Sequence, residues 1–395
     1  MRSQHAATVR LPSMRQASAR EVMAATLATL PGREPASSVV ILDGDSVSMK
    51  VVNGQLLLED GSKSQRRTLQ LTRAHVNARP GWRIVILAWH GMVTLDALAW
   101  CQALDVQVIA LDPKMERVIL HGAPTSSDNA RLRRAQATAP GQPIGLEITR
   151  FLLGEKIRGQ RDVLGRLGYQ VDDVDLACEA MADDPAGRAE AVRECLGLES
   201  VVASIYWQCW SEIACTWAER DLRQVPQHWR TAGQRTSNRG KSPRNAITPV
   251  QAMLNYCYRL LETEAVIALR KIGLDPGMGV FHTDKPNRAS MALDCMEAVR
   301  PAVDGYVLSL VESRTFGRGD VMELQDGTCR LLPPVSHMLT QQLPGWRQAI
   351  GPVVEHVANL LRPADAIGQK TTTTPLTRAN ASRAQQEIKR RRRAA

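Results

Sequence analysis

The chain has 395 residues, of which 44% are apolar and 23% are charged, and its formal net charge is +10 at pH 7. This composition is typical of a globular protein with large cores, and it excludes a disordered chain and a small disulfide-stabilised domain. No window offers about 18 uninterrupted apolar residues, and the first residues lack a secretory signal. We therefore expect a cytoplasmic protein that has no membrane span.

Residues 1–37 predict a flexible N-terminal extension, and regular patterns begin at residue 38. Between residues 38 and 122, short apolar runs predict a compact β-rich domain with one helix, over residues 94–104. The pair Asn53-Gly54 between two apolar runs predicts a tight hairpin, because both residues tolerate positive φ. The predicted strands cover residues 38–42, 47–52, 56–58, 68–71, 83–88 and 106–111.

Residues 123–143 are rich in Pro, Ser, Asp, Gly and Thr and predict an interdomain linker around a basic helix. Residues 144–362 show helical spacing almost throughout, which predicts an α-helical second domain. Gly273 and Pro276 form a typical stop signal after the longest helix. The fold class is therefore α+β, with a small β-rich N-terminal domain and a larger all-α C-terminal domain. The predicted helices of the second domain cover residues 144–167, 173–181, 186–196, 199–218, 249–272, 289–299 and 303–313.

The positive charge is concentrated at the two ends of the chain. Residues 1–34 carry five Arg and two Glu, and residues 363–395, a predicted disordered basic tail, carry eight basic and two acidic residues. The body between them still contains one strongly basic segment, residues 223–244, which has six cations and no acid. A contact with DNA phosphates and a solvated loop are both open interpretations of this segment. Its cations are Arg223, Arg230, Arg235, Arg239, Lys241 and Arg244.

Eight cysteines are scattered along the chain without any C-x-x-C pair. This pattern favours neither a zinc site nor a disulfide framework. We predict that the cysteines are reduced and mostly buried, as free cysteines usually are.

The helix predicted over residues 289–299 is almost wholly apolar but carries two acids, Asp294 and Glu297. Three residues apart on a helix, the two carboxylates lie on one face. Buried acids are costly unless positive charge compensates them, and a divalent cation would neutralise both. A narrow solvent-exposed stripe is the alternative interpretation.

Two further residues could complete a metal site. His282 stands in a turn shortly before the acid pair, where an imidazole can complete a mixed nitrogen and oxygen ligand set. A structural histidine is the alternative. Glu199 is predicted at the start of an apolar helix, where it is either a third ligand or an N-terminal capping charge.

Two sequence blocks together are specific enough to indicate a protein family: GLDPGMGVFH at residues 273–282 and LDCMEAVRP at residues 293–301. With residues 83–87, 133–136 and 199–206 they resemble the Cas one family, the CRISPR-associated integrases of spacer acquisition. The resemblance covers about residues 38–335. It implies an N-terminal β domain that makes a dimer contact and a C-terminal helical domain that holds the active site.

The resemblance implies that Glu199, His282 and Glu297 are metal ligands and that Asp294 is a neighbouring acid of the active site. Ser200 replaces a usual Gly, and Glu297 stands where some relatives have Asp. Neither change removes a ligand atom. The family pattern gives no role for the N-terminal extension or the basic tail.

The implied activity is that of a DNA endonuclease and integrase that uses Mg²⁺ or Mn²⁺. It would insert short DNA fragments into a repeat array by attack of a 3′-hydroxyl on a phosphodiester, as part of antiviral defence. The implied partners are double-stranded DNA, a second copy of the chain and a Cas two protein dimer, and residues 223–244 would contact DNA. A stand-alone or transposon-encoded integrase of the same family is one alternative. A catalytically silent DNA-binding scaffold is the other, and the complete set of four side chains argues against it.

Overall fold

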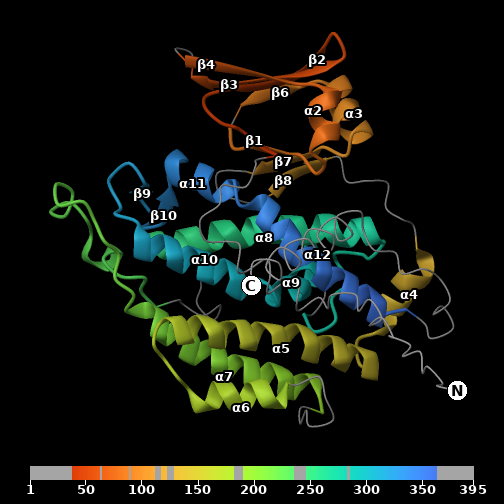
Figure 1. The fold of residues 1–395 in the computed structure, drawn as a ribbon, viewed down its shortest axis with the longest axis vertical. Helices are drawn as coiled ribbons and strands as arrows, with labels where there is room; N and C mark the ends of the chain where they lie inside the picture. Colours follow the sequence, from red (N-terminus) through yellow and green to blue (C-terminus); the bar gives the residue numbers. More distant parts are fainter. Residues whose placement is uncertain are drawn as a thin grey trace, which may run out of the picture.

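The computed structural model describes residues 38–62, 65–88, 90–111, 117–121, 129–181, 190–234, 246–282 and 285–362. The first part of the chain forms most of the strands and the second part most of the helices (Figure 1), which confirms the predicted α+β class. The predicted extension, residues 1–37, and the predicted tail, residues 363–395, lie outside the described residues.

The outer of two four-stranded sheets has the strand order β4-β3-β2-β6. Strands β2, β3 and β4 form an antiparallel meander, and β6 pairs in parallel with β2. Asn53 and Gly54 have φ of 51° and 74° at the turn between β2 and β3, which confirms the predicted hairpin. The strands are β2 (Val47–Val52), β3 (Gln55–Ser62), β4 (Gln65–Leu71) and β6 (Gly91–Val93).

The inner sheet, in the order β1-β5-β7-β8, lies between two hydrophobic cores. Along β1, Val40 and Leu42 face the core shared with the outer sheet, whereas Val39 and Ile41 belong to the helical core. Strands β1, β5 and β7 are parallel and buried on both faces, so their sequences are apolar apart from the first residue of β5 and of β7. The strands are β1 (Val39–Leu42), β5 (Arg83–Ile86), β7 (Gln107–Leu111) and β8 (Arg117–His121), the last antiparallel to β7.

Among the described residues, two helices accompany these sheets, so the prediction of a single helix in this region is wrong. Helix α3 (Leu95–Ala103) matches the predicted one, while α2 (Arg73–Ala78) has no predicted counterpart. A capping box between Thr72 and His75 begins α2, and Val76 is its buried residue. With one buried position in six residues, its sequence carries almost no helical periodicity.

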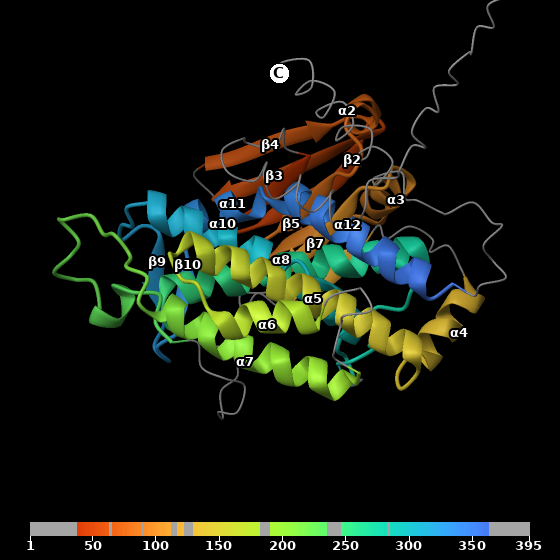
Figure 2. The same ribbon diagram turned by 60° about the horizontal axis from the view of Figure 1, so that its bottom comes forward.

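Helix α8 (Pro249–Ile272) runs through the middle of the second part and is buried on most faces. Helices α9 to α12 contact it, and α5 lies between this group and the outer helices α6 and α7 (Figures 1 and 2). None of the helices that the structure describes is both long and apolar enough to cross a bilayer. The other helices are α4 (Ala130–Thr138), α5 (Pro143–Arg166), α6 (Asp172–Ala180), α7 (Val192–Ser211), α9 (Ser290–Glu297), α10 (Arg300–Ser313), α11 (Pro333–Thr340) and α12 (Leu343–Leu360).

Several details of the helical prediction are wrong: helices α11 and α12 have no predicted counterpart, and the helix predicted to end at residue 218 ends at residue 211. Helix α7 is continuous from residue 192 to residue 211, where the sequence predicts one helix ending at 196 and another beginning at 199. Gly197 inside a helix costs only about 1 kcal/mol, which the buried face of α7 offsets. A hairpin of β9 (Val321–Glu323) and β10 (Cys329–Leu331) also interrupts the part predicted as all-α.

The eight cysteines are all free thiols, and seven of them are buried, which confirms the prediction for these residues. Burial raises the pKa of Cys101 and Cys215 to about 12. These thiols are therefore neutral packing groups at physiological pH.

A buried ion pair joins the inner sheet to the central helix. Arg83, at the start of β5, and Glu264, in the middle of α8, are 2% and 1% exposed. The distances are 2.6 Å from Arg83 Nε to Glu264 Oε1 and 2.8 Å from Nη2 to Oε2. This bidentate geometry fixes both the separation and the orientation of the two elements.

We expect Arg83→Met or Glu264→Gln to lower the free energy of unfolding by about 3–5 kcal/mol, because each leaves a buried charged partner unmatched. The double variant Arg83→Met/Glu264→Met should be much less destabilised than the two single variants together. Urea unfolding followed by tryptophan fluorescence measures both effects. Strictly additive losses would contradict the coupling.

Candidate active site

Helices α5, α7 and α9 and the loop after α8 converge on one cluster of charged side chains. A glycine permits part of this approach: a Cβ on Gly159 of α5 would lie 2.6 Å from Pro301 Cβ at the start of α10. Lys156, about one turn earlier on α5, forms ion pairs with Glu199 of α7 and Glu297 of α9.

The loop that carries His282 is fixed at its start by α4. Helix α8 ends at Gly273, whose φ of 93° is left-handed, which confirms the predicted stop signal. The buried Gln136 side chain then holds the loop. Its Nε2 donates to the carbonyls of Asp275 (2.7 Å) and Met278 (2.9 Å), and its Oε1 accepts from the Asp275 N–H (2.9 Å).

The Asp294 carboxylate holds the other end of this loop. It accepts hydrogen bonds from the backbone N–H groups of Val280, Phe281 (3.3 Å) and His282 (3.1 Å). The same carboxylate lies 2.5 Å from Nδ1 of His282. Burial raises the pKa of Asp294, although the hydrogen bond from His282 opposes the shift. Asp294 therefore orients the imidazole and leaves Nε2 as its outward nitrogen.

Glu297, one turn further along α9, faces two cations instead. Its Oε2 lies 2.7 Å from Lys156 Nζ, and its Oε1 lies 2.9 Å from Nη1 of Arg300. Burial by itself would raise the pKa of this carboxyl, but Arg300 and Lys156 outweigh burial and lower the pKa to about 2. Glu297 is therefore an anion at all physiological pH values.

Glu199 reaches the same ammonium from α7. Lys156 Nζ donates a hydrogen bond to Glu199 Oε1. Glu199 lies in the interior of α7, not at a helix start, so the capping interpretation is wrong. Glu194 has that capping role, because its carboxylate accepts from the backbone N–H of Ala191 at 3.2 Å.

Arg300 is held in place by an aromatic ring behind the carboxylate cluster. Its guanidinium lies over the Tyr258 ring, 5.1 Å from the centroid. The Tyr258 hydroxyl donates to buried Asp304, which also accepts from the Tyr206 hydroxyl at 2.9 Å. Asp304 thereby ties α7 and α8 to α10 behind the carboxylate cluster.

The structure brings the four predicted site residues together as two neighbouring pairs, His282 with Asp294 and Glu199 with Glu297. Asp294 and Glu297 are 0% and 4% exposed, so the interpretation of the pair as a solvent-exposed stripe is wrong. The two acids have different protein partners: Lys156 and Arg300 for Glu297, and backbone N–H groups and His282 for Asp294. Within the described residues, no group of three or more His, Cys, Asp or Glu side chains is arranged to hold a metal ion.

Three residues of this cluster, Lys156, Arg300 and Gln136, are missing from the sequence prediction. Arg300 and Gln136 stand inside segments that carry the family resemblance, but nothing in the pattern assigns them a role. The sequence offers one signal for Lys156: this lysine stands among the apolar residues Leu152, Leu153 and Ile157, which are buried in α5. A buried lysine needs an acidic partner, although the sequence does not say which.

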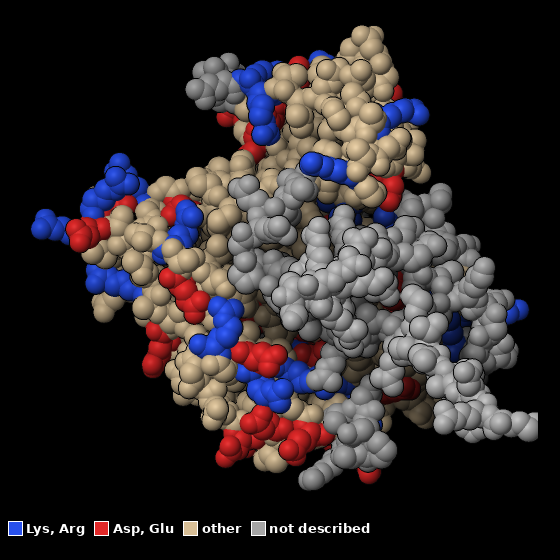
Figure 3. All heavy atoms as spheres, viewed as in Figure 1, with Lys and Arg blue, Asp and Glu red and all other residues tan. Residues whose placement is uncertain are grey.

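The basic segment is described only in part. Arg223 and Arg230 are exposed, and Nη2 of Arg230 donates to the carbonyl of Leu222 at 3.3 Å. Figure 3 shows basic side chains, with a few acidic ones, at the end of the molecule where the segment between α7 and α8 projects. The remaining cations, Arg235, Arg239, Lys241 and Arg244, lie outside the described residues.

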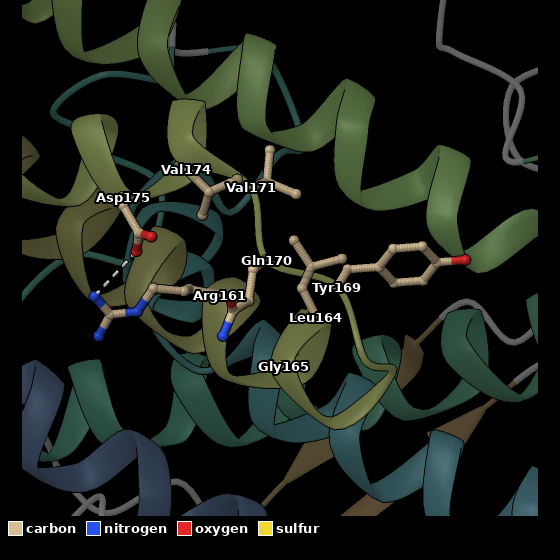
Figure 4. Close-up of a pocket in the computed structure, with 8 residues that line it drawn as sticks. All are labelled: Arg161, Leu164, Gly165, Tyr169, Gln170, Val171, Val174 and Asp175. Carbon is tan, nitrogen blue, oxygen red and sulfur yellow. Dashed lines mark ion pairs between the residues drawn. The ribbon is translucent and has the colours of Figure 1, made fainter.

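A separate pocket lies at the C-terminal end of α5 (Figure 4). It is lined by Leu164, Gly165 and Tyr169, among others, and carries an ion pair between Arg161 and Asp175 at 3.6 Å. It contains none of the predicted site residues. An exposed ion pair of this kind contributes little to the stability of the fold.

We expect Gly279→Ala to lower the free energy of unfolding by about 1–3 kcal/mol, because its Cβ would lie 2.5 Å from the His282 carbonyl oxygen and 2.8 Å from Ser290 Cβ. Gly165→Ala is the matched control: it meets no atom within 4 Å inside α5 and should stabilise by about 0.5–1 kcal/mol. Urea unfolding measures both. Equal stability of the two alanine variants would contradict the close approach at Gly279.

This chain is similar to known proteins in sequence and in fold. The family model described as "CRISPR associated protein Cas1" matches residues 64–343. A CRISPR-associated endonuclease Cas1 from Archaeoglobus fulgidus is 27% identical over 317 residues, which are 74% of this chain and 85% of the relative. Another, from Rhodospirillum rubrum, is 30% identical over 244 residues, 58% of this chain and 66% of the relative.

Solved structures show the same fold at lower identity. A casposase bound to integration product has a TM-score of 0.65 at 24% identity, and the match covers 85% of this chain and 93% of the casposase. The Cas1 protein from Thermotoga maritima has a TM-score of 0.60 at 18% identity, with 81% of this chain and 96% of that chain covered. On the match of the family model over residues 64–343, the chain belongs to the CRISPR associated protein Cas1 family.

Proposed function

We propose that this chain is a metal-dependent DNA integrase and endonuclease of CRISPR adaptation, which inserts short DNA fragments into a repeat array. One observation carries the proposal: Glu199 of α7 and Glu297 of α9 converge on a single ammonium beside the His282–Asp294 pair. The curated relatives described as Cas1 endonucleases support the same reaction class.

The donor atoms of these side chains are of the kinds that bind Mg²⁺ or Mn²⁺. Carboxylate oxygens and an imidazole nitrogen suit these ions, and Glu199, Glu297 and His282 supply them. Among the described residues, buried Oε2 of Glu297 has no hydrogen-bond partner, although Lys156 lies near it. When bound, the ion would polarise a phosphoryl oxygen and offset the negative charge of the transition state.

The reaction is a transesterification at phosphorus. The 3′-hydroxyl of the inserted fragment attacks a target phosphodiester, a new P–O bond forms, and the bond to the target's own 3′-oxygen breaks. The attacking hydroxyl loses a proton and the departing oxygen gains one. Nδ1 of His282 is held by Asp294, so Nε2 is the imidazole nitrogen that would bind the ion. Water in place of the hydroxyl gives endonuclease cleavage.

The proposed partners are double-stranded DNA, a second copy of the chain and a Cas two protein dimer. The exposed Arg223 and Arg230 support DNA binding by the basic segment, since cations of this kind neutralise phosphates. A solved Cas6-RT-Cas1–Cas2 complex contains a chain of the same fold, with a TM-score of 0.56 at 16% identity. The homodimer is a prediction from the family resemblance.

We expect Glu199→Gln, His282→Ala and Glu297→Gln each to reduce strand joining by about 100-fold or more, because each removes a proposed metal ligand. The assay combines the full chain, a short duplex with free 3′ ends, a supercoiled plasmid carrying a repeat array, and Mn²⁺. Joining is measured as covalent transfer of labelled fragment.

Glu212→Gln is the control, because Glu212 is an exposed acid at the C-terminal end of the same helix as Glu199. Parental joining by all three site variants would refute the site. Insertions mapped by sequencing to the array boundary support CRISPR adaptation, whereas insertions scattered over the plasmid support a stand-alone integrase.

For DNA binding, we measure the slope of log affinity against log salt concentration. We expect Arg223→Gln/Arg230→Gln to make this negative slope shallower by up to about two, one for each lost phosphate contact. The matched control is Arg73→Gln/Arg79→Gln, which removes two exposed arginines around α2. Fluorescence anisotropy with a labelled duplex at several salt concentrations measures the slope. An unchanged slope for the first pair would show that Arg223 and Arg230 are solvated side chains and not phosphate contacts.

A further inference from the structure

The ammonium of Lys156 lies between the two carboxylates proposed as metal ligands. It is 2.7 Å from Glu297 Oε2 and donates a hydrogen bond to Glu199 Oε1. The side chains of Lys156 and Glu297 are 10% and 5% exposed, so water screens this arrangement little. A cation of this chain thus stands between the groups that a divalent ion would join.

We propose that Lys156 is a displaceable internal cation that neutralises Glu199 and Glu297 in the absence of metal and competes with the divalent ion for both carboxylates. The inference rests on the proposed metal site. It adds a residue that sets the metal affinity and that holds the two acids close together before metal binds.

Lys156 and Arg300 differ in how they are held. Arg300 contacts Glu297 and lies over the Tyr258 ring, and the charge of Asp304 also stabilises it. The ion-pair partners of Lys156 among the described residues are the two proposed ligands. A lysine carries its charge on a flexible four-carbon stem, so the ammonium can leave without moving α5. Arg300 is therefore the permanent partner of Glu297, and Lys156 the exchangeable one.

The charges of the cluster support exchange. Glu199 and Glu297 together carry two negative charges, and Lys156 and Arg300 carry two positive charges, so the charges of these four groups sum to zero without metal. A divalent ion makes the cluster net positive. The displaced ammonium then adds positive charge near the ion, where an anionic phosphodiester must bind.

The first test uses the unmodified full chain. Lysine acetylation with acetic anhydride, read by mass spectrometry, compares the metal-free protein with the protein in Mg²⁺. We expect Mg²⁺ to raise labelling of Lys156 several-fold, because the ammonium loses its two carboxylate partners. Lys271, which pairs with Asp105 at 2.8 Å far along α8, should be labelled equally in both conditions. Unchanged labelling of Lys156 would overturn the proposal.

The second test measures Mn²⁺ binding by calorimetry, with no DNA present. Lys156→Met should bind Mn²⁺ about tenfold more tightly than the parental chain, because the site no longer has to release its own cation. It should also melt at a lower temperature in EDTA and regain most of that loss in Mn²⁺. Lys271→Met is the matched control, with parental affinity and parental melting in both conditions.

The outcomes separate this inference from the proposed function. If the parental chain binds Mn²⁺ and Glu199→Gln abolishes binding while Lys156→Met leaves it equal or weaker, Lys156 is not a competitor and the metal site stands. If the parental chain binds no Mn²⁺, the metal site and this inference both fall. The labelling test needs no variant, so poor folding of Lys156→Met does not prevent a decision.

Discussion

The cost of placing carboxylates inside a helical core governs the arrangement of this protein. Helix α9 carries two acids among apolar residues, and its burial is compatible with folding only because other elements bring positive charge or hydrogen-bond donors to each acid. Lys156 comes from α5, Arg300 from α10, and the N–H groups for Asp294 from the loop after α8. The position of α9 thus depends on three other segments, and the same contacts build the candidate site.

The β-rich part is connected to this cluster through α8. The inner sheet presents alternate residues to two cores, and Arg83 of that sheet donates to both carboxylate oxygens of Glu264 in α8 through Nε and Nη2. Helix α8 runs from this contact to Gly273, where it enters the loop of His282. Because Arg83 ties the inner sheet to α8, a movement of the sheet would also move α8 and the His282 loop that follows it. The buried ion pair fixes that geometry more than it adds net stability, because desolvation offsets much of its attraction.

Local patterns in the sequence predict much of the fold. They fail where contacts between distant segments determine the bounds of an element or the partners of a side chain. Asn53-Gly54 and Gly273 are predicted correctly, because their positive φ is a property of one or two residues. Glu199 is misplaced at a helix start, because Gly197 locally weakens a helix that the buried face of α7 nevertheless keeps continuous. The four site residues are candidates by residue type and position, and the family motifs add the roles expected of them. Lys156 is absent from the prediction, because an ammonium between two distant acids has no local signature.

The two acids of α9 show how one helix can supply two different chemical groups. Burial raises the pKa of Asp294, which is surrounded by backbone N–H groups and His282, whereas Arg300 and Lys156 overcome burial and lower the pKa of Glu297 to about 2. Environments that separate the pKa values of neighbouring acids assign them different tasks. Both carboxylate oxygens of Asp294 are hydrogen-bonded to the loop or to the imidazole, so Asp294 positions His282. Glu297 keeps its full negative charge beside exchangeable and permanent cations, and that charge is what a metal ligand requires.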